Sequence, residues 1–379
     1  MTEIVFTGGQ ALLDGALPLA DVAVRDGCIA SPGAARLARS FDASGLLVLP
    51  GIVDLHGDAF ERQMQPRPNV SFPPVFALAE TERQLLGCGI TTAFHSATLS
   101  WEPGLRGIVA WRALLAAMGA RRWTCDMRVH LRWEAFNLEA LAEVMDDIAA
   151  GRVHLVAFND HMDAVLRDVR GPDRGSKYAK RAGLDLADFA NLAERTGARA
   201  AEVPAALDRL ATLCRSRGLP MASHDDETID TRQAFSARGA AICEFPVTEP
   251  VGRYARAQGD AVVMGSPNVV RGGSHLGWTS AAEMAERGIC SVLTSDYFYP
   301  CLIEAPFVLQ ARGALDLASA WALVSSNPAA ASGLSDRGRL EAGLRGDLVV
   351  VDPELRCAVL TLVAGQIAYL SAEGDARLG

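Results

Sequence analysis

A histidine and an acidic residue end an apolar run near the beginning of the chain. Residues 46–60 read LLVLPGIVDLHGDAF, and the run closes with His56 and Asp58 on either side of Gly57. Residues i and i+2 of an extended strand point to the same side, so this pair could bind one metal ion. The alternative is that Asp58 only caps a following helix.

Further residues of these types follow other short apolar segments. They are Glu134, Asp160, His161, His224, Asp225, Asp226 and Asp296. Four of the seven histidines lie at or just after a predicted strand, namely His56, His161, His224 and His275. Imidazole and carboxylate ligands suit Zn²⁺ and Mn²⁺. We therefore predict a centre of one or two divalent ions, with Zn²⁺ expected first and Mn²⁺ or iron as alternatives. The predicted ligands are His56, Asp58, Glu134, His161, His224 and Asp296.

Two ions need a bridging anion, which in some barrels is a carboxylated lysine at a strand end. The only two lysines here, Lys177 and Lys180, both lie in the polar segment GPDRGSKYAKRAG, so Glu134 is expected to bridge instead. Its alternative role is an exposed acid in the first turn of a helix. The remaining histidines are His130 and His154, which lie mid-strand and are expected in the core, and His95, whose role stays open.

The segments that must position these residues alternate in a regular way. Residues 51 to about 325 alternate short β-branched runs with longer amphipathic stretches, the pattern of βα units around a parallel sheet. The eight candidate strands are 51–56, 91–96, 127–133, 153–160, 220–224, 240–245, 261–267 and 290–296. This pattern predicts an α/β fold with a (β/α)8 TIM-like barrel, whose strand carboxyl ends carry the active site. A doubly wound open sheet is the alternative.

Both ends of the chain read as short alternating strands separated by turn residues. We expect residues 1–50 and 336–379 to pair into one small β-sandwich and residues 51–335 to form the barrel. The stretch 66–74, PRPNVSFPP, is expected to be a loop after the first barrel strand.

Charge and composition exclude several classes of protein. The net charge of −9 argues against a general nucleic-acid binder, which needs clustered cations to neutralise phosphates. No apolar stretch approaches the roughly 18 residues of a membrane span, and the first residues do not form a signal sequence. We therefore expect a cytoplasmic protein with no membrane partner. The eight cysteines are scattered singly, which favours reduced thiols. Barrels of this size often form homodimers, and the sequence leaves the oligomeric state open.

Several motifs resemble a known superfamily of hydrolases. The frame LPGIVDLHGD, together with NPA and GRLEAGLRGDLVVVD near the end, is similar to the amidohydrolase superfamily of metal-dependent hydrolases. More narrowly, HGDAFERQMQPRPNVSFP, HLRWE, NDH, ASHDDET, EFP, GSPNVVRGGSH and TSDY resemble the triphosphate diphosphatases of the carbon–phosphorus lyase pathway. The resemblance spans nearly the whole chain. Asp58 stands where most superfamily members carry a second histidine, whereas the diphosphatases have this HxD pattern.

The resemblance implies hydrolysis of α-D-ribose 1-methylphosphonate 5-triphosphate to the 5-phosphate and pyrophosphate. A bound metal would activate a water by lowering its pKa, Asp296 would accept the proton, and the water would attack the α-phosphorus. Asp296 could also touch a metal. Such a phosphorylated sugar needs a local cluster of cations and backbone N–H groups. The expected substrate-binding residues are Arg67, Lys177, Tyr178, Arg271, Gly272, Gly273, Ser274 and His275.

Two alternatives remain at this point. The first is an amidohydrolase that acts on a cyclic amide or an N-acyl substrate with the same metals, which would not require so many cationic residues. The second is a barrel that has lost its metals and serves as a binding or scaffold subunit.

Overall fold

The computed structural model describes residues 3–31, 39–67, 70–273 and 279–379 of the chain. Its centre is a sheet of eight parallel strands in which each strand pairs with the next one along the chain. The strands are β7 (Ile52–Gly57), β8 (Ile90–Leu99), β9 (Asp126–Glu134), β10 (Leu155–Asn159), β11 (Met221–His224), β12 (Ile242–Glu244), β13 (Ala261–Gly265) and β14 (Val292–Thr294). Each of the eight predicted strands overlaps one of these.

The first and last strands of this sheet also meet. A parallel bridge joins Gly57 to Asp296, just beyond β14, and backbone N–H groups on both sides of the bridge donate hydrogen bonds across it. The sheet is therefore barrel-like, and its unbroken strand order excludes a doubly wound sheet, in which the order reverses. The predicted barrel-like arrangement is confirmed.

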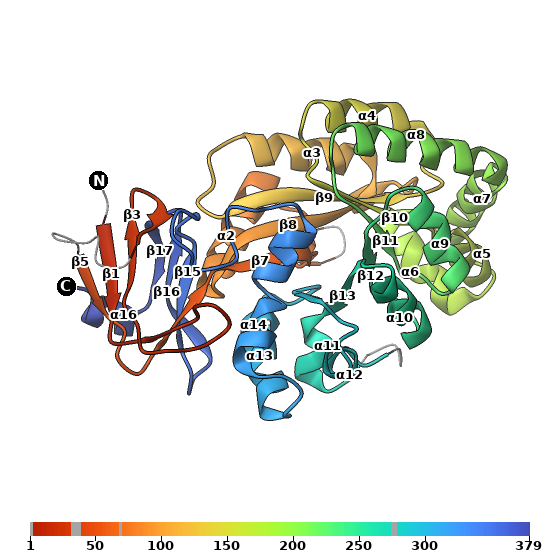
Figure 1. Cartoon of the computed structure of the whole chain (residues 1–379). Helices are drawn as coiled ribbons and strands as arrows, with labels where there is room; N and C mark the ends of the chain where they lie inside the picture. The colour runs from red at the N-terminus through yellow and green to blue at the C-terminus, as the bar shows by residue number, and fades with distance from the viewer. Residues whose placement is uncertain (1–2, 32–38, 68–69, 274–278) are drawn as a thin grey trace.

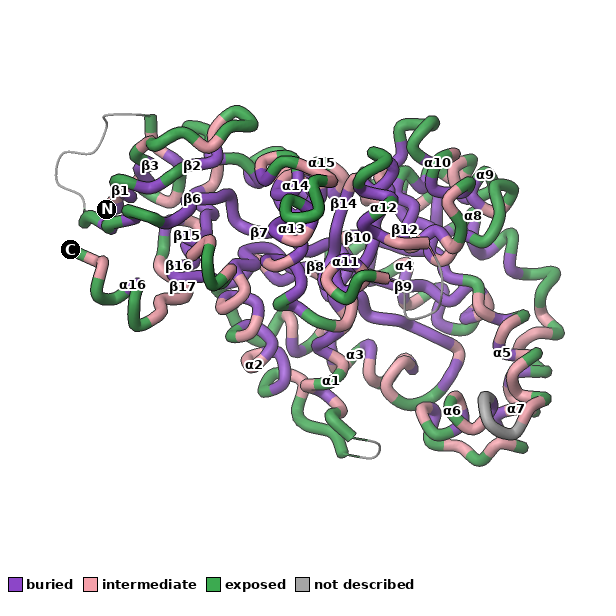
Figure 2. The backbone as a smooth tube through the Cα atoms, turned by 90° about the horizontal axis from the view of Figure 1, so that it is seen from below, coloured by how far each residue is buried: buried purple, intermediate pink, exposed green. Residues whose placement is uncertain are grey.

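Apolar side chains fill the barrel, as expected for parallel strands that are covered on both sides. One cluster lies inside it and includes Val53, Leu55, Phe94, Leu155 and Val263, all buried. A larger cluster packs the outer faces of the strands against the surrounding helices. Figure 2 shows the strands as a buried centre, with helices whose outer faces are exposed.

Helices follow every barrel strand (Figure 1). After β7 come α1 (Phe60–Met64) and α2 (Pro74–Gly87), after β8 comes α3 (Ile108–Gly119), and after β9 comes α4 (Leu141–Ala149). After β11 and β12 come α9 (Ile229–Ala237) and α10 (Glu249–Ala257), and after β13 come α11 (Ser266–Arg271) and α12 (Ala281–Glu286). The last group is α13 (Cys301–Ala311), α14 (Leu317–Ala322) and α15 (Ser326–Ala331).

The connection from β10 to β11 is the longest and holds four helices. They are α5 (Met162–Asp168), α6 (Pro172–Ala182), α7 (Leu186–Gly197) and α8 (Val203–Ser216). The first three share a small apolar cluster of their own that includes Ala179 and Phe189, and Phe189 stacks on Trp101 from the loop after β8. This helical group is therefore anchored to the barrel through Trp101.

Two further sheets lie beside the barrel, at the left of Figure 1. The smaller sheet consists of β4 (Cys28–Ile29), β3 (Val22–Arg25), β1 (Glu3–Thr7) and β5 (Arg39–Asp42). The larger one consists of β17 (Gln366–Leu370), β16 (Cys357–Val363), β15 (Leu348–Asp352), β6 (Leu47–Pro50) and β2 (Gln10–Ala11). One apolar cluster packs between the two sheets.

The larger sheet combines strands from both ends of the chain, as the sequence predicts, whereas the smaller sheet contains only N-terminal strands. The strands expected near the end of the chain are present as β15, β16 and β17, and a short helix, α16 (Ala372–Arg377), follows them. The domain boundaries at residues 50 and 335 stay a prediction. Among the described residues, no helix is long and apolar enough to cross a membrane.

Candidate active site

A cavity of about 480 Å³ opens at the carboxyl ends of the barrel strands. All six predicted metal ligands line it: His56, Asp58, Glu134, His161, His224 and Asp296. The barrel explains why residues from such distant parts of the sequence meet, because parallel strands present their carboxyl ends at one face. The N-cap residue of α1 is Ala59 rather than Asp58, and no side-chain bond caps the helix, which argues against the capping alternative.

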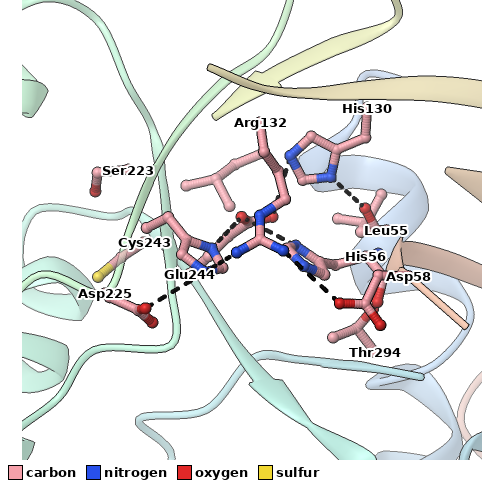
Figure 3. Close-up of polar contacts among 12 residues, drawn as sticks. Leu55, His56, Asp58, His130, Arg132, Ser223, Asp225, Cys243, Glu244 and Thr294 are labelled. Carbon is pink, nitrogen blue, oxygen red and sulfur yellow. Dashed lines mark hydrogen bonds and ion pairs between the residues drawn. The ribbon is translucent and has the colours of Figure 1, made fainter. Parts of the chain in front are cut away.

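Glu244, at the end of β12, lies between two of the histidines. Its Oε2 atom is 3.1 Å from Nδ1 of His56 and 3.1 Å from Nδ1 of His224 (Figure 3). The two rings are nearly parallel, with their centroids 5.2 Å apart. One ligand atom from each of the three residues lies within 4.8 Å of the others, so this group could hold a metal ion.

The protonation states fit that role. Burial lowers the pKa of His56 and of His224 well below the usual range, and the neighbouring Arg132 lowers both further. Both rings are therefore neutral, which is the form of histidine that binds metals. Burial also raises the pKa of Glu244 to about 7. Oε1 of Glu244 and Nε2 of the adjacent His130 lie 3.7 Å apart, and both are buried without a hydrogen bond among the described residues, so a cation or water between them would satisfy both.

Two further acidic residues of the cavity are Asp58 and Asp296. Burial and the nearby charge of Glu61 raise the pKa of Asp58 to about 6. Burial and the charge of Asp58 raise the pKa of Asp296 to about 7. Buried carboxyl groups that lie near other carboxylates are stabilised in their ionised form by a bound cation, so the donor set fits a divalent metal.

Glu134 and His161 do not join the group around Glu244. Instead Nδ1 of His161 lies 2.7 Å from Oε1 of Glu134, and Nε2 lies 3.4 Å from Asp225. Burial alone would lower the pKa of His161, but the charge of Glu134 and the contact with Asp225 raise it to about 10. His161 is therefore a cation paired with Glu134, and the role of Glu134 as a bridge between two ions stays a prediction.

Sequence reasoning missed two residues at the centre of the site, Glu244 and Arg132. Glu244 ends the sixth strand, so the rule that identified the other strand-end acids would have found it. Arg132 stands two residues before Glu134 on β9 and therefore shares its side of the strand. Its guanidinium donates to Nε2 of His224 over 2.8 Å.

The expected substrate-binding residues are only partly brought together. Lys177, Tyr178, Arg271 and Gly273 line the cavity. Arg67 is exposed and does not line it, because it belongs to the loop beyond α1. Gly272 ends α11 with a left-handed φ of 81° and does not line it either. Ser274 and His275 lie outside the described residues.

Other charged groups that the sequence did not single out also line the cavity. Arg106 pairs with Glu61, and Arg181 donates to both oxygens of Glu102. Of the remaining histidines, His95 is buried in β8 against Phe60 and does not line the cavity.

Comparisons with known proteins agree with this architecture. A model of the amidohydrolase family matches residues 77–369. The chain belongs to the amidohydrolase family. This amidohydrolase is 31% identical over 325 residues to the alpha-D-ribose 1-methylphosphonate 5-triphosphate diphosphatase of Escherichia coli (strain K12). That match covers 83% of this chain and 85% of the relative. The resemblance inferred from the motifs is thus confirmed.

Two solved structures share the fold at low sequence identity. N-acetylglucosamine-6-phosphate deacetylase from Pasteurella multocida is 10% identical with a TM-score of 0.66, over 96% of this chain and 99% of that one. Molinate hydrolase is 15% identical with a TM-score of 0.62, over 97% and 94% of the two chains. The family match and the similarity to the diphosphatase support a hydrolase, so a barrel that serves only as a scaffold is not supported.

Proposed function

We propose that this amidohydrolase hydrolyses α-D-ribose 1-methylphosphonate 5-triphosphate to the 5-phosphate and pyrophosphate. The observation that carries the proposal is one cavity in which a candidate metal centre faces cationic side chains. The diphosphatase of Escherichia coli supports the choice of substrate through its similarity over most of both chains.

The ion would be held at the carboxyl ends of β7, β12 and β14. His56, Asp58 and Asp296 are its proposed ligands on the cavity side, with Glu244 behind the ring of His56. A divalent ion bound there supplies a Lewis acid that lowers the pKa of a water and offsets negative charge at phosphorus. Zn²⁺ is the first candidate, and Mn²⁺ and iron remain alternatives for this ligand set.

Asp296 is the proposed proton acceptor. Its carboxylate lies in the cavity beside Asp58, where it can accept a proton from a water bound near the ion. Its carboxylate takes a proton from the water that attacks the α-phosphorus, and pyrophosphate leaves from the opposite side. Attack at this phosphorus requires the triphosphate to lie with its terminal groups away from Asp296.

Cationic side chains from two connections would bind those terminal groups. Lys177 and Arg181 reach the cavity from α6, and Arg271 reaches it from the end of α11, where it donates to the hydroxyl of Tyr297 over 3.2 Å. Phosphoryl transfer depends mainly on positioning and on charge stabilisation, which these residues supply. A cyclic amide or N-acyl substrate carries less negative charge and would not need these three cationic side chains.

Product analysis tests the proposal. The purified protein, loaded with Zn²⁺ or Mn²⁺, is incubated with the ribose triphosphate and separately with a panel of N-acyl amino acids and cyclic amides. We expect pyrophosphate and the 5-phosphate in the ³¹P NMR spectrum, and no acid release from the amides. Hydrolysis of an amide without pyrophosphate formation from the triphosphate would overturn it.

A further inference from the structure

Arg132 lies at the centre of the candidate metal site. Its side chain comes from β9, is almost fully buried, and extends among the strand-end residues in Figure 3. Nη2 donates to Nε2 of His224 over 2.8 Å, and Nη1 lies 3.7 Å from Oδ2 of Asp58. The guanidinium therefore bridges an imidazole and a carboxylate from opposite sides of the barrel, as a metal ion would.

This contact fixes the state of His224. A guanidinium can only donate hydrogen bonds, so Nε2 of His224 must accept. The neutral ring then carries its proton on Nδ1 and donates it to Oε2 of Glu244 over 3.1 Å. Both nitrogens of His224 are engaged, and neither has a lone pair left for an ion while Arg132 is in place.

His56 is different in this respect. Its Nδ1 atom also lies 3.1 Å from Oε2 of Glu244, but its Nε2 atom has no hydrogen-bond partner in the part of the chain that the structure describes. His56 and Asp58 both line the cavity, and Asp296 lies beside them through the bridge to Gly57. One ion can therefore bind on the His56 side without displacing Arg132.

The charges around Arg132 agree with this role. Five carboxylates surround the centre, and they belong to Asp58, Glu134, Asp225, Glu244 and Asp296. Glu134 has its own cation in His161. Arg132 lies among the other four and comes within 3.7 Å of Asp58, so its positive charge offsets theirs as a bound cation would.

We infer that Arg132 takes the place of a second metal ion, so that each chain binds one divalent ion, held on the His56 side. This inference rests on the proposed metal-dependent function. It assigns a different role to each of the two histidines that lie 3.1 Å from Oε2 of Glu244: His56 binds the ion, whereas His224 binds the guanidinium.

Metal stoichiometry tests the inference directly. The full chain is freed of metal, dialysed to saturation against MnCl₂, and analysed for bound manganese and by EPR. We expect one Mn²⁺ per wild-type chain, with the spectrum of an isolated ion. In R132Q and R132M, which remove the charge, we expect two ions per chain and the multiline spectrum of an exchange-coupled pair. R132K keeps a positive charge and should stay at one ion.

Arg128 provides the matched control. It stands four residues earlier on β9 and pairs with Asp126, away from the cavity, so R128M should bind one ion. Two ions in the wild-type chain, or one ion in both R132Q and R132M, would overturn the inference. A wild-type chain that binds two ions and still releases pyrophosphate refutes the role of Arg132 alone. A chain with one ion that releases no pyrophosphate refutes the proposed function alone.

Discussion

The backbone N–H of Asp296 donates a hydrogen bond to the carbonyl oxygen of His56 over 2.9 Å. The N–H of Asp58 donates in return to the carbonyl oxygen of Asp296 over 2.8 Å. The barrel thus closes at the residues proposed to hold the ion. Asp296 has a left-handed φ of 54°, a conformation that costs energy in a non-glycine residue and often marks functional sites. These residues are therefore positioned by the sheet itself.

Replacing Asp296 with Asn should remove catalysis while the barrel remains closed. The amide cannot accept a proton from water, but the backbone bonds to His56 and Asp58 do not depend on the side chain. We expect kcat to fall by at least about 100-fold, with little change in the melting temperature. The control is Asp316→Asn, which alters the cap of α14 and should leave kcat unchanged. A D296N enzyme with near wild-type kcat would show that another group accepts the proton.

Replacing Glu244 with Gln should weaken metal binding. Its single oxygen Oε2 orients the rings of both His56 and His224, and removal of such a charged partner typically costs 10- to 100-fold in metal affinity. Competition with a fluorescent chelator measures the affinity. Glu82→Gln is a suitable control, because Glu82 is also buried but accepts from the backbone of Thr124 and Cys125. Unchanged affinity in E244Q would contradict the assignment.

The two lysines allow a matched test of substrate binding. Lys177 lines the cavity and Lys180, one turn later on α6, does not. Lys177→Met should raise KM for the triphosphate about tenfold with kcat nearly unchanged, a loss of about 1.4 kcal/mol of binding. Lys180→Met should leave both constants as they are. Equal effects of the two substitutions would mean that Lys177 acts only through the general charge of the surface.

His95 should make stability depend on pH. Burial lowers its pKa from 6.5 to about 4, so the unfolded chain binds a proton between these values and the folded chain does not. Its contribution is fully present above pH 6.5 and is lost as pH falls toward 4. Between pH 7 and pH 5 the wild type should lose about 2 kcal/mol more of unfolding free energy than His95→Phe.

Urea unfolding at the two pH values measures this difference. Ser96→Ala removes a neighbouring buried hydroxyl that has no partner among the described residues and does not titrate, so it should lose as much stability on acidification as the wild type. The same loss in H95F would show that His95 is protonated in the folded protein or can leave the core easily.

Much of the fold could be predicted from periodicity. The eight strands are short β-branched runs buried on both faces, and such runs stand out against the amphipathic helices between them. The terminal helix α16 was missed, because its six residues are too few for a helical period to show. The pairing of β6 with β15 could be expected only because one shared sandwich is the simplest arrangement for the strands at both ends of the chain. No local pattern predicts it, since it joins segments about 300 residues apart.

The candidate site was predictable where chemistry coincides with strand ends. His56, Asp58, His224 and Asp296 were found by that rule, and Glu244 obeys it as well. The contact between Arg132 and His224 could not be found in this way, because it depends on side-chain reach across the barrel. The pairing of Glu134 with His161 likewise depends on distances that spacing does not determine.

The most direct test of the proposed function uses ¹⁸O-labelled water to identify the phosphorus atom that the water attacks. The metal-loaded enzyme hydrolyses the ribose triphosphate in H₂¹⁸O, and mass spectrometry locates the label in the products. Attack at the α-phosphorus places one ¹⁸O in the 5-phosphate and none in pyrophosphate, which is the result we expect. Label in pyrophosphate, or release of orthophosphate in its place, would contradict water attack at the α-phosphorus.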